Sequence, residues 1–589
     1  MDPYYLILCY YIYSQHVLAQ FLRNLISEPG MLKPPYSKMI KFFYTLLLFT
    51  CIIQSIRAQD QKLAQTPPMG WNSWNAFEVK INEPIIKQIA DAMVSTGMKA
   101  AGYEYLVIDD AWMAPERDAL GNLAADPIKF PHGMKAIGDY IHSKGLKFGI
   151  YECRGYLTCQ KLPGSFKHEQ EDMNSFASWG VDYIKLDACY AEKNGRLSTE
   201  DFSIYRDCIN NTGRPMVLSI SDFGNGAWAW GGKNYAQLWR SSGDIYPTME
   251  SVYYNASTSG GAGSIHPGFN GLWQFAGPGH WNDPDLLEVG NLANQNEDKA
   301  HFSLWSILAA PLMASTDLRS MTENTRKILT APEVIAVNQD SRGLQGFKIV
   351  KKKNKEIYAK PLSDGTIAAL LLNKGKVKTD ITVTWNQLGL EGIQKVRDVW
   401  KQKNLGIFKN HFTAHNLAKD GLLYIKVGSP GSAPIPGPTA LSPDKYTITK
   451  NGTTYLSDLF YIMKSGEPPV YDKSYSGQTL SINGVKYNKG LGCKSESRIM
   501  YKLDGKADRF KTVVGLDDHY SGKETGRFRV LNEDYFGNRI LFDSDKMRKG
   551  SAALNIDLDV KGIQFILLEF SGKESQGNWG NVNITASSN

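Results

Sequence analysis

Two aspartates follow short strand-like runs and could supply the pair of carboxyl groups that an acid–base or nucleophilic reaction needs. Asp187 ends the run 181–187, and Asp244 comes shortly after the run 238–240. Carboxylates at the carboxyl ends of parallel strands commonly form the reactive centre of strand–helix proteins. Two carboxyl groups on different strands are the minimum equipment for hydrolysing a glycosidic bond. A lone aspartate is more often a helix cap or an ion-pair partner. Neighbouring motifs must therefore show whether these two aspartates are catalytic.

Strand-like and helix-like segments alternate between residues 66 and 338. The strand-like runs are 103–109, 146–151, 181–187, 216–219, 238–240 and 280–283, and the helical stretches are 134–143, 168–178 and 199–210. This alternation predicts a parallel sheet, and its length fits an eight-fold (β/α)8 TIM barrel. A doubly wound open sheet is the alternative architecture. Acidic residues collect at the predicted strand ends, where the active sites of such barrels lie.

Beyond the barrel the pattern changes to short strands between turns. We expect an antiparallel β-sandwich over 346–428, a linker rich in Pro, Gly and Ser over 429–441, and a C-terminal β-sandwich module over 442–589. The dense basic run 351–355 is expected at a solvated hairpin tip.

Length and composition exclude several classes of protein. A chain of 589 residues is longer than a single hydrophobic core can usually organise, so several domains are expected. The net charge of +7 is modest, and no basic face interleaves with aromatic residues, so we expect no nucleic-acid partner. The sequence carries no Walker loop and no zinc-like spacing of Cys and His. We therefore predict neither a cofactor nor a metal site.

Residues 1–58 are interpreted as an N-terminal extension and signal peptide. A short basic start at Met39 precedes an apolar run over 42–53, and Ala58 offers a small residue for cleavage. We hypothesise that translation starts at Met39. The protein is expected in the periplasm or outside the cell, without stable membrane insertion of the mature chain. A lipid anchor at Cys51 is the minor alternative.

Five cysteines lie beyond this segment, namely Cys153, Cys159, Cys189, Cys208 and Cys493. An odd number in an oxidising compartment allows one or two disulfides and leaves at least one free thiol.

Five short motifs occur in a fixed order along the predicted barrel. They are Met69-Gly-Trp-Asn-Ser-Trp74, Ile108-Asp-Asp-Ala-Trp112, Tyr183-Ile-Lys-Leu-Asp187, Arg240-Ser-Ser-Gly-Asp244 and Trp281-Asn-Asp-Pro-Asp285. Together they closely resemble glycoside hydrolase family 27, the melibiase-type α-galactosidases, over residues 66–427. The tail from Ser442 resembles the novel putative carbohydrate-binding module. It departs from that module at 490–494, where Gly-Leu-Gly-Cys-Lys replaces the usual Gly-Leu-Gly-Thr-His.

The resemblance implies a retaining exo-glycosidase that works by double displacement. Asp187 would attack the anomeric carbon, while Asp244 would protonate the departing oxygen and then deprotonate water. Retention predicts carboxyl groups about 5 Å apart. Lys185, on the same strand face, is expected to keep Asp187 ionised. Asp244 is expected to hold a proton because Asp187 is near and because it is partly buried.

The resemblance also implies the sugar contacts. Asp109 and Asp110 would bind the 4- and 6-hydroxyl groups, Trp74 would form an apolar wall, and Arg240 would position groups and contact the sugar. Further contacts are expected from Tyr151, Lys185, Asp285 and Leu286. Cys159 and Cys189 match a disulfide beside the site.

The substrate expected from the resemblance is a galactose-containing oligosaccharide or polysaccharide. Asp222 stands on the loop that senses the 2-substituent and would accept a hydrogen bond from a 2-hydroxyl group. The alternatives are a β-L-arabinopyranosidase or an α-N-acetylgalactosaminidase on the same scaffold, and an inactive sugar-binding protein. The sequence leaves the oligomeric state open.

Overall fold

The computed structural model describes residues 63–587, apart from 192–197, 223–226, 231–234, 261–271, 430–447, 449–450, 460, 466–468, 504, 535–536 and 564. The predicted signal segment and most of the predicted linker therefore lie outside the described residues. Among the described residues, no helix has the length and apolar character needed to cross a membrane.

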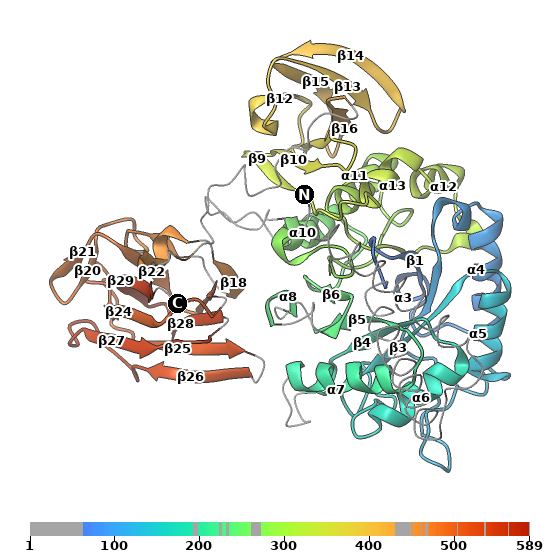
Figure 1. The fold of residues 1–589 in the computed structure, drawn as a ribbon, viewed down its shortest axis with the longest axis horizontal. Coiled ribbons are helices and arrows are strands. Elements are labelled where there is room, and N and C mark those ends of the chain that lie inside the picture. Colours follow the sequence, from blue (N-terminus) through green and yellow to red (C-terminus); the bar gives the residue numbers. More distant parts are fainter. Residues whose placement is uncertain are drawn as a thin grey trace, which may run out of the picture. The chain divides into compact units, whose positions relative to one another are not determined.

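Eight parallel strands form one sheet in the order β7-β6-β5-β4-β3-β2-β1-β8 (Figure 1). They are β1 (Met69–Asn72), β2 (Tyr105–Ile108), β3 (Lys147–Cys153), β4 (Tyr183–Asp187), β5 (Val217–Ser221), β6 (Leu238–Arg240), β7 (Trp281–Asp283) and β8 (Leu312–Ala314). The two ends of this order are joined by a parallel bridge between Leu287, just beyond β7, and Ala314 of β8. The predicted TIM-like barrel is confirmed.

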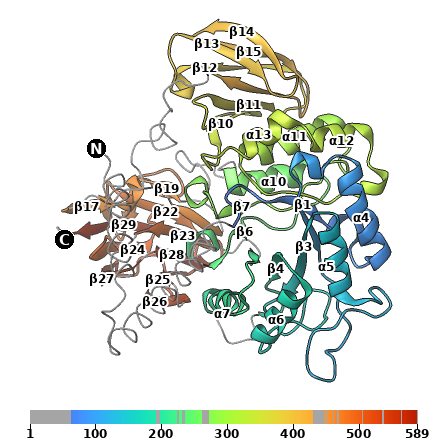
Figure 2. The ribbon, with the colours of Figure 1, turned by 45° about the vertical axis from the view of Figure 1, so that its right-hand side comes forward.

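Helices follow most of these strands. They are α3 (Trp74–Phe77), α4 (Glu83–Ser95), α5 (Gly133–Ser143), α6 (Glu169–Trp179), α7 (Ser198–Asn211), α8 (Ala227–Trp230), α10 (Met249–Gly260), α11 (Gln295–Ile307), α12 (Glu323–Leu329) and α13 (Pro332–Asn338). Helices α4, α5 and α6 lie side by side outside the strands (Figure 2). Their buried faces, with Ile86, Ile89 and Ile137 fully enclosed, join the core around the sheet.

Alternation along β4 explains how the barrel presents its polar side chains. Ile184 and Leu186 are fully buried in the core between strands and helices. Tyr183, Lys185 and Asp187 share the opposite face of the strand. Because all eight strands are parallel, the residues that end each strand meet at one end of the barrel.

The strand-rich region after the barrel contains a six-stranded antiparallel sheet, β14-β13-β16-β11-β10-β9, and a two-stranded sheet, β12-β15. Its strands are β9 (Phe347–Lys352), β10 (Lys355–Pro361), β11 (Ile367–Asn373), β12 (Thr379–Thr384), β13 (Ile393–Asp398), β14 (Lys403–Lys409), β15 (His411–Leu417) and β16 (Leu422–Val427). The basic run lies at the turn between β9 and β10, as predicted. The buried Lys360 amine donates to the carbonyl of Val337 at the end of α13 (2.6 Å), which ties this sheet to the barrel helices.

The C-terminal region is a second antiparallel sandwich. One sheet has the order β19-β22-β29-β24-β27 with β17 beside β29, a second has the order β18-β23-β28-β25-β26, and β20 pairs with β21. The strands are β17 (Gly452–Tyr455), β18 (Ile462–Ser465), β19 (Val470–Tyr471), β20 (Leu480–Ile482), β21 (Val485–Tyr487), β22 (Gly490–Lys494), β23 (Ser497–Lys502), β24 (Arg509–Leu516), β25 (Gly526–Asp534), β26 (Gly537–Asp543), β27 (Leu554–Asp559), β28 (Phe565–Gly572) and β29 (Gln576–Ala586). Phe528, Phe570 and Trp579 pack together in its core.

Candidate functional site

A cavity of about 620 Å³ opens at the carboxyl ends of the barrel strands. Its walls contain eleven of the predicted site residues and eight others. The eleven are Trp74, Asp109, Asp110, Tyr151, Cys159, Lys185, Asp187, Arg240, Asp244, Asp285 and Leu286. Cavities of roughly this size enclose small-molecule ligands. The structure thus brings together side chains from six different strand ends.

Asp187 lies at the end of β4 and is 7% exposed. Its Oδ2 accepts a hydrogen bond from the Tyr151 hydroxyl group (2.9 Å), and its Oδ1 accepts one from the backbone N–H of Ala188 (2.8 Å). Burial raises the pKa of Asp187, whereas the charge of Lys185 and these two hydrogen bonds lower it. The predicted influence of Lys185 is present, but burial has the larger effect on this pKa, which the sequence did not reveal.

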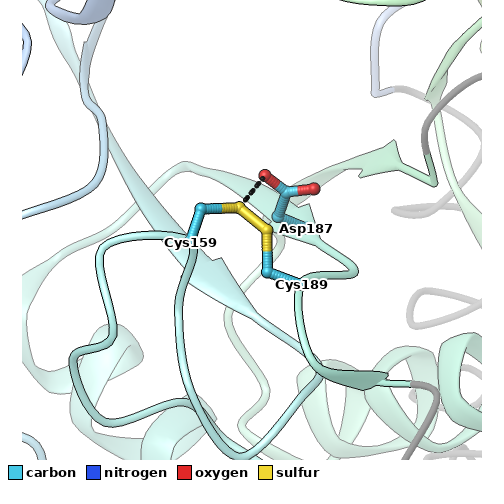
Figure 3. Close-up of side chains that lie close together, drawn as sticks. All are labelled: Cys159, Asp187 and Cys189. Atoms are coloured by element: carbon cyan, nitrogen blue, oxygen red, sulfur yellow. Dashed lines mark hydrogen bonds between the residues drawn. A yellow bond between two sulfur atoms is a disulfide. The ribbon is translucent and has the colours of Figure 1, made fainter.

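A disulfide lies directly beside Asp187 (Figure 3). It joins Cys159 and Cys189, whose Cα atoms are 5.2 Å apart, and the Cys159 sulfur lies 3.6 Å from Asp187 Oδ2. The pairing implied by the resemblance is confirmed. The two sulfurs and the Asp187 carboxylate are close enough to hold a metal ion. However, sulfur atoms bonded to each other are not thiolates, which are the form that binds metal.

The remaining cysteines of the described chain are Cys153, Cys208 and Cys493, and each is a buried free thiol. Burial raises the pKa of Cys208 to about 11 and that of Cys493 to about 12, so both stay protonated near neutral pH.

Asp109 and Asp110 follow β2 and are held differently. Asp109 Oδ2 accepts hydrogen bonds from the Lys185 ammonium group (2.8 Å) and the Asn72 amide (2.7 Å). Asp110 accepts from the backbone N–H groups of Ala111 (2.6 Å) and Gln160 (3.0 Å). Burial nevertheless raises the pKa of Asp110 to about 6. Asp109 is therefore held by a cation and an amide, whereas burial favours the protonated form of Asp110. Both side chains carry oxygens that can accept hydrogen bonds.

Arg240, at the end of β6, connects two further carboxylates. Its Nη2 lies 3.0 Å from Asp285 Oδ2 and 3.2 Å from Asp244 Oδ1. Burial of the Arg240 side chain lowers its pKa, but the charges of the neighbouring carboxylates, led by Asp285, outweigh this effect and raise the pKa above its ordinary value. Asp285 also accepts from the backbone N–H of Ile245 (2.8 Å), which fixes the loop that carries Asp244.

Asp244 differs from its prediction in one respect. Its side chain is 72% exposed, so the expected partial burial is wrong. The residue lies on the loop between β6 and α10, beyond the end of the strand, in a part of the loop that is exposed to solvent. Asp244 lines the cavity together with Asp187.

Backbone strain occurs next to one buried carboxylate, Asp110, and at another, Asp285. Ala111 has a φ of 71° and Asp285 has a φ of 87°, both in the left-handed region that side-chain-bearing residues seldom adopt. Such conformations cost roughly 1–3 kcal/mol each and concentrate at functional sites.

Asp222 directly follows β5 but is not among the residues that line the cavity. It is buried, and its Oδ1 pairs with the Arg154 guanidinium group (3.2 Å), which also binds Asp201 (2.6 Å). The residue of this segment that lines the cavity is Ser221, which is the register partner of Asp187 on the adjacent strand. Asp222 is therefore an ion-pair partner, and the neighbouring Phe223 lies outside the described residues.

Sequence reasoning also missed several cavity-lining residues. They include Asn75, Glu78, Ser221, Tyr246, Pro247, Glu288 and Asn291. Buried Glu288 accepts hydrogen bonds from the amides of Asn75 and Asn291. Its position three residues after Asp285, in the segment that leaves the same strand, is the signal that could have identified it.

Comparisons with known proteins agree with this arrangement. Residues 66–340 match the family described as Alpha galactosidase A, 352–427 match the Alpha galactosidase C-terminal beta sandwich domain, and 452–585 match the NPCBM/NEW2 domain. Alpha-galactosidase A of Cellvibrio japonicus is 43% identical over 389 residues, which are 65% of this chain and 95% of that protein. Alpha-galactosidase 2 of Arabidopsis thaliana is 42% identical over 61% of this chain and 89% of its own length.

A solved structure is also similar to this chain. The crystal structure of alpha-galactosidase I from Mortierella vinacea superposes with a TM-score of 0.58 at 34% identity, and it covers 63% of this chain and all of that one (100%).

The buried Arg154 generates a prediction about stability. Replacing it in Arg154→Met removes the guanidinium group that pairs with buried Asp201 and Asp222, and breaking such a buried pair costs about 3–5 kcal/mol. We expect a clearly lower denaturant midpoint. The control Lys135→Met removes an exposed ion pair with Asp139 and should change the midpoint little. Equal midpoints for Arg154→Met and the wild-type protein would contradict the ion-pair assignment of Asp222.

Proposed function

Because this chain belongs to the melibiase-type α-galactosidase family of glycoside hydrolases, we propose that it removes terminal α-galactosyl residues from oligosaccharides or polysaccharides with retention of configuration. The observation that carries the proposal is the pairing of a buried, hydrogen-bonded carboxylate, Asp187, with an exposed carboxylate, Asp244, in one cavity. A retaining glycosidase needs a nucleophile and an acid/base with different surroundings.

In the first step, Asp187 attacks the anomeric carbon and forms a covalent glycosyl-enzyme, while Asp244 gives its proton to the departing oxygen. The Tyr151 hydroxyl group and the Ala188 N–H hold the nucleophile in one orientation. In the second step, Asp244 takes a proton from water, which attacks the same carbon and releases Asp187. An exposed Asp244 side chain is well placed to reach both the leaving group and incoming water.

Galactose selectivity is proposed to come from polar groups in the wall of the cavity, two of them acceptors and one a donor. Asp109, Asp110 and Lys185 offer a fixed set of hydrogen-bonding groups for hydroxyl groups on one side of a sugar ring. A ligand that lacks one of these hydroxyl groups leaves a buried polar group unpaired, which is unfavourable.

Catalytic roles are tested by replacing each carboxylate. Asp187→Asn should reduce kcat by roughly a thousandfold or more, because the nucleophile is lost. Asp244→Asn should slow substrates with poor leaving groups by roughly 10²–10⁴-fold and activated aryl galactosides far less in the first step. Asp139→Asn, at an exposed helix position, is the control. Near-normal turnover in Asp187→Asn would refute the assignment.

The Tyr151 hydroxyl group generates a pH prediction. It lowers the pKa of Asp187, so Tyr151→Phe should raise that pKa further. Because Asp187 must be ionised to attack, the acidic limb of the kcat/KM profile should move to higher pH, and the rate near neutrality should fall by about tenfold. Tyr103→Phe is the matched control, since its buried hydroxyl group binds the carbonyl of Leu329 and does not line the cavity. An unmoved acidic limb in Tyr151→Phe would contradict the role of this hydrogen bond.

Substrate choice is tested with three nitrophenyl glycosides, namely the α-galactoside, the α-N-acetylgalactosaminide and the β-L-arabinopyranoside. We expect the highest kcat/KM for the α-galactoside, because the arabinoside leaves the partner of the 6-hydroxyl group empty. A preference for the arabinoside would keep the mechanism and reject galactose selectivity. Binding without turnover of any of the three would favour a sugar-binding protein.

A further inference from the structure

Asn255 is a fully buried polar side chain that does not line the cavity and that the proposed reaction does not use. It lies on α10, the helix that follows the loop carrying Asp244. Its amide nitrogen donates hydrogen bonds to two backbone carbonyls, that of Gly243 (3.0 Å) and that of Pro284 (2.9 Å). These two residues directly precede Asp244 and Asp285 in the sequence. One side chain thus joins the two segments that bring Asp244 and Asp285 to the cavity.

The bond to Gly243 acts on the least restricted part of the loop. A glycine backbone can adopt more conformations than that of any other residue. Gly243 and Asp244 are both exposed, so packing does little to fix them. On the far side of Asp244, the backbone N–H of Ile245 donates to Asp285 Oδ2 (2.8 Å). The amide of Asn255 and the carboxylate of Asp285 therefore hold the backbone on either side of Asp244.

The bond to Pro284 is supported by other hydrogen bonds in the same segment. The Pro284 carbonyl also accepts from the Ser242 hydroxyl group (3.2 Å). The next N–H along the chain, that of Asp285, donates to Asp283 Oδ1 (2.8 Å). Loss of the Asn255 amide would therefore disturb this segment less than the exposed loop on the other side.

The helix that carries Asn255 is itself held in place. Val252 and Ala256 of α10 are buried in the core around the barrel. The Tyr253 hydroxyl group donates to the buried Asp420 of the antiparallel region that follows the barrel (2.7 Å). Side chains on packed helices hold their partners more precisely than side chains on loops do. Helix α10 therefore gives the amide of Asn255 a fixed position from which to bind the loop.

We propose that Asn255 is a positioning residue for the acid/base Asp244. The inference rests on the proposed function and deepens it, because it names a residue that acts on the reaction through Asp244 without touching the sugar. Proton transfer requires the carboxyl group to lie within hydrogen-bond reach of the departing oxygen. A misplacement of about 1 Å can cost about 100-fold in rate. By holding the Gly243 carbonyl, Asn255 narrows the range of positions that the carboxyl group of Asp244 can take.

The test compares two leaving groups that differ in their need for a proton. Melibiose has a sugar as its poor leaving group, whereas dinitrophenyl α-galactoside has a leaving group that departs without protonation. In Asn255→Ala, kcat/KM for melibiose should fall by about tenfold, because the acid is less often within reach. The value for the aryl galactoside should stay within about twofold of the wild-type value. Asn255→Leu fills the space without donating hydrogen bonds, and it should show the same loss on melibiose.

Asn338→Ala is the matched control. Asn338 is a buried asparagine of α13 that does not line the cavity, and its amide also donates to two backbone carbonyls, those of Trp305 (3.2 Å) and Ala310 (2.9 Å). Both alanine variants should lower the denaturant midpoint, because each leaves buried carbonyls without a donor. Only Asn255→Ala should change the ratio of the two kcat/KM values.

A double variant tests whether Asn255 acts through Asp244. In the Asp244→Asn protein, Asn255→Ala should cost no further activity on melibiose, because the group that it positions is gone. A further loss of about tenfold in that protein would overturn the proposal. So would an equal loss on both substrates or no loss on melibiose in Asn255→Ala, or wild-type activity on melibiose in Asn255→Leu. Failure of the wild-type protein to cleave either substrate would instead reject the proposed function.

Discussion

The structure of the site depends on keeping several carboxyl groups close together where water is largely excluded. The buried members are Asp109, Asp110, Asp187 and Asp285, and the two cations among them are the partly buried Lys185 and the buried Arg240. Burial disfavours the charged form of a carboxylate, and neighbouring negative charges add to that cost. Each cation offsets part of it through a direct ion pair. The strands, the loops and the disulfide together hold the partners of these ion pairs at fixed positions.

The parallel strands fix the positions of most side chains in the site. Because the register pairs Asp187 with Cys153 on β3 and Ser221 on β5, neighbouring strand ends lie at fixed heights around the cavity. Beyond the ends of the strands, loop conformation and a disulfide hold the site residues in place. The backbone is strained at Ala111 and Asp285, and the Cys159–Cys189 disulfide joins the segments that follow β3 and β4.

The two carboxyl groups of the proposed reaction have opposite surroundings. Asp187 is enclosed and fixed by two donors, whereas the Asp244 side chain is mostly exposed on a loop. This contrast suits their roles, because a nucleophile gains from fixed orientation and an acid/base must exchange protons with the leaving group and with water. The loop itself is held by Arg240 and Asp285, so exposure of the carboxyl group does not require a loosely attached backbone.

The sequence by itself determined the barrel, most of its strands and the residues that end them, because alternation of strands and helices follows from local periodicity. It did not identify β1 or β8, whose short runs carry too little periodicity, and it did not predict the ion pair of Asp222. Arg154 lies 68 residues from Asp222, so only folding brings the two charges together. The burial of individual carboxyl groups could likewise not be predicted from the sequence. The exposure of Asp244 and the raised pKa of Asp187 depend on the segments that cover each carboxyl group, and only the tertiary structure decides which segments those are.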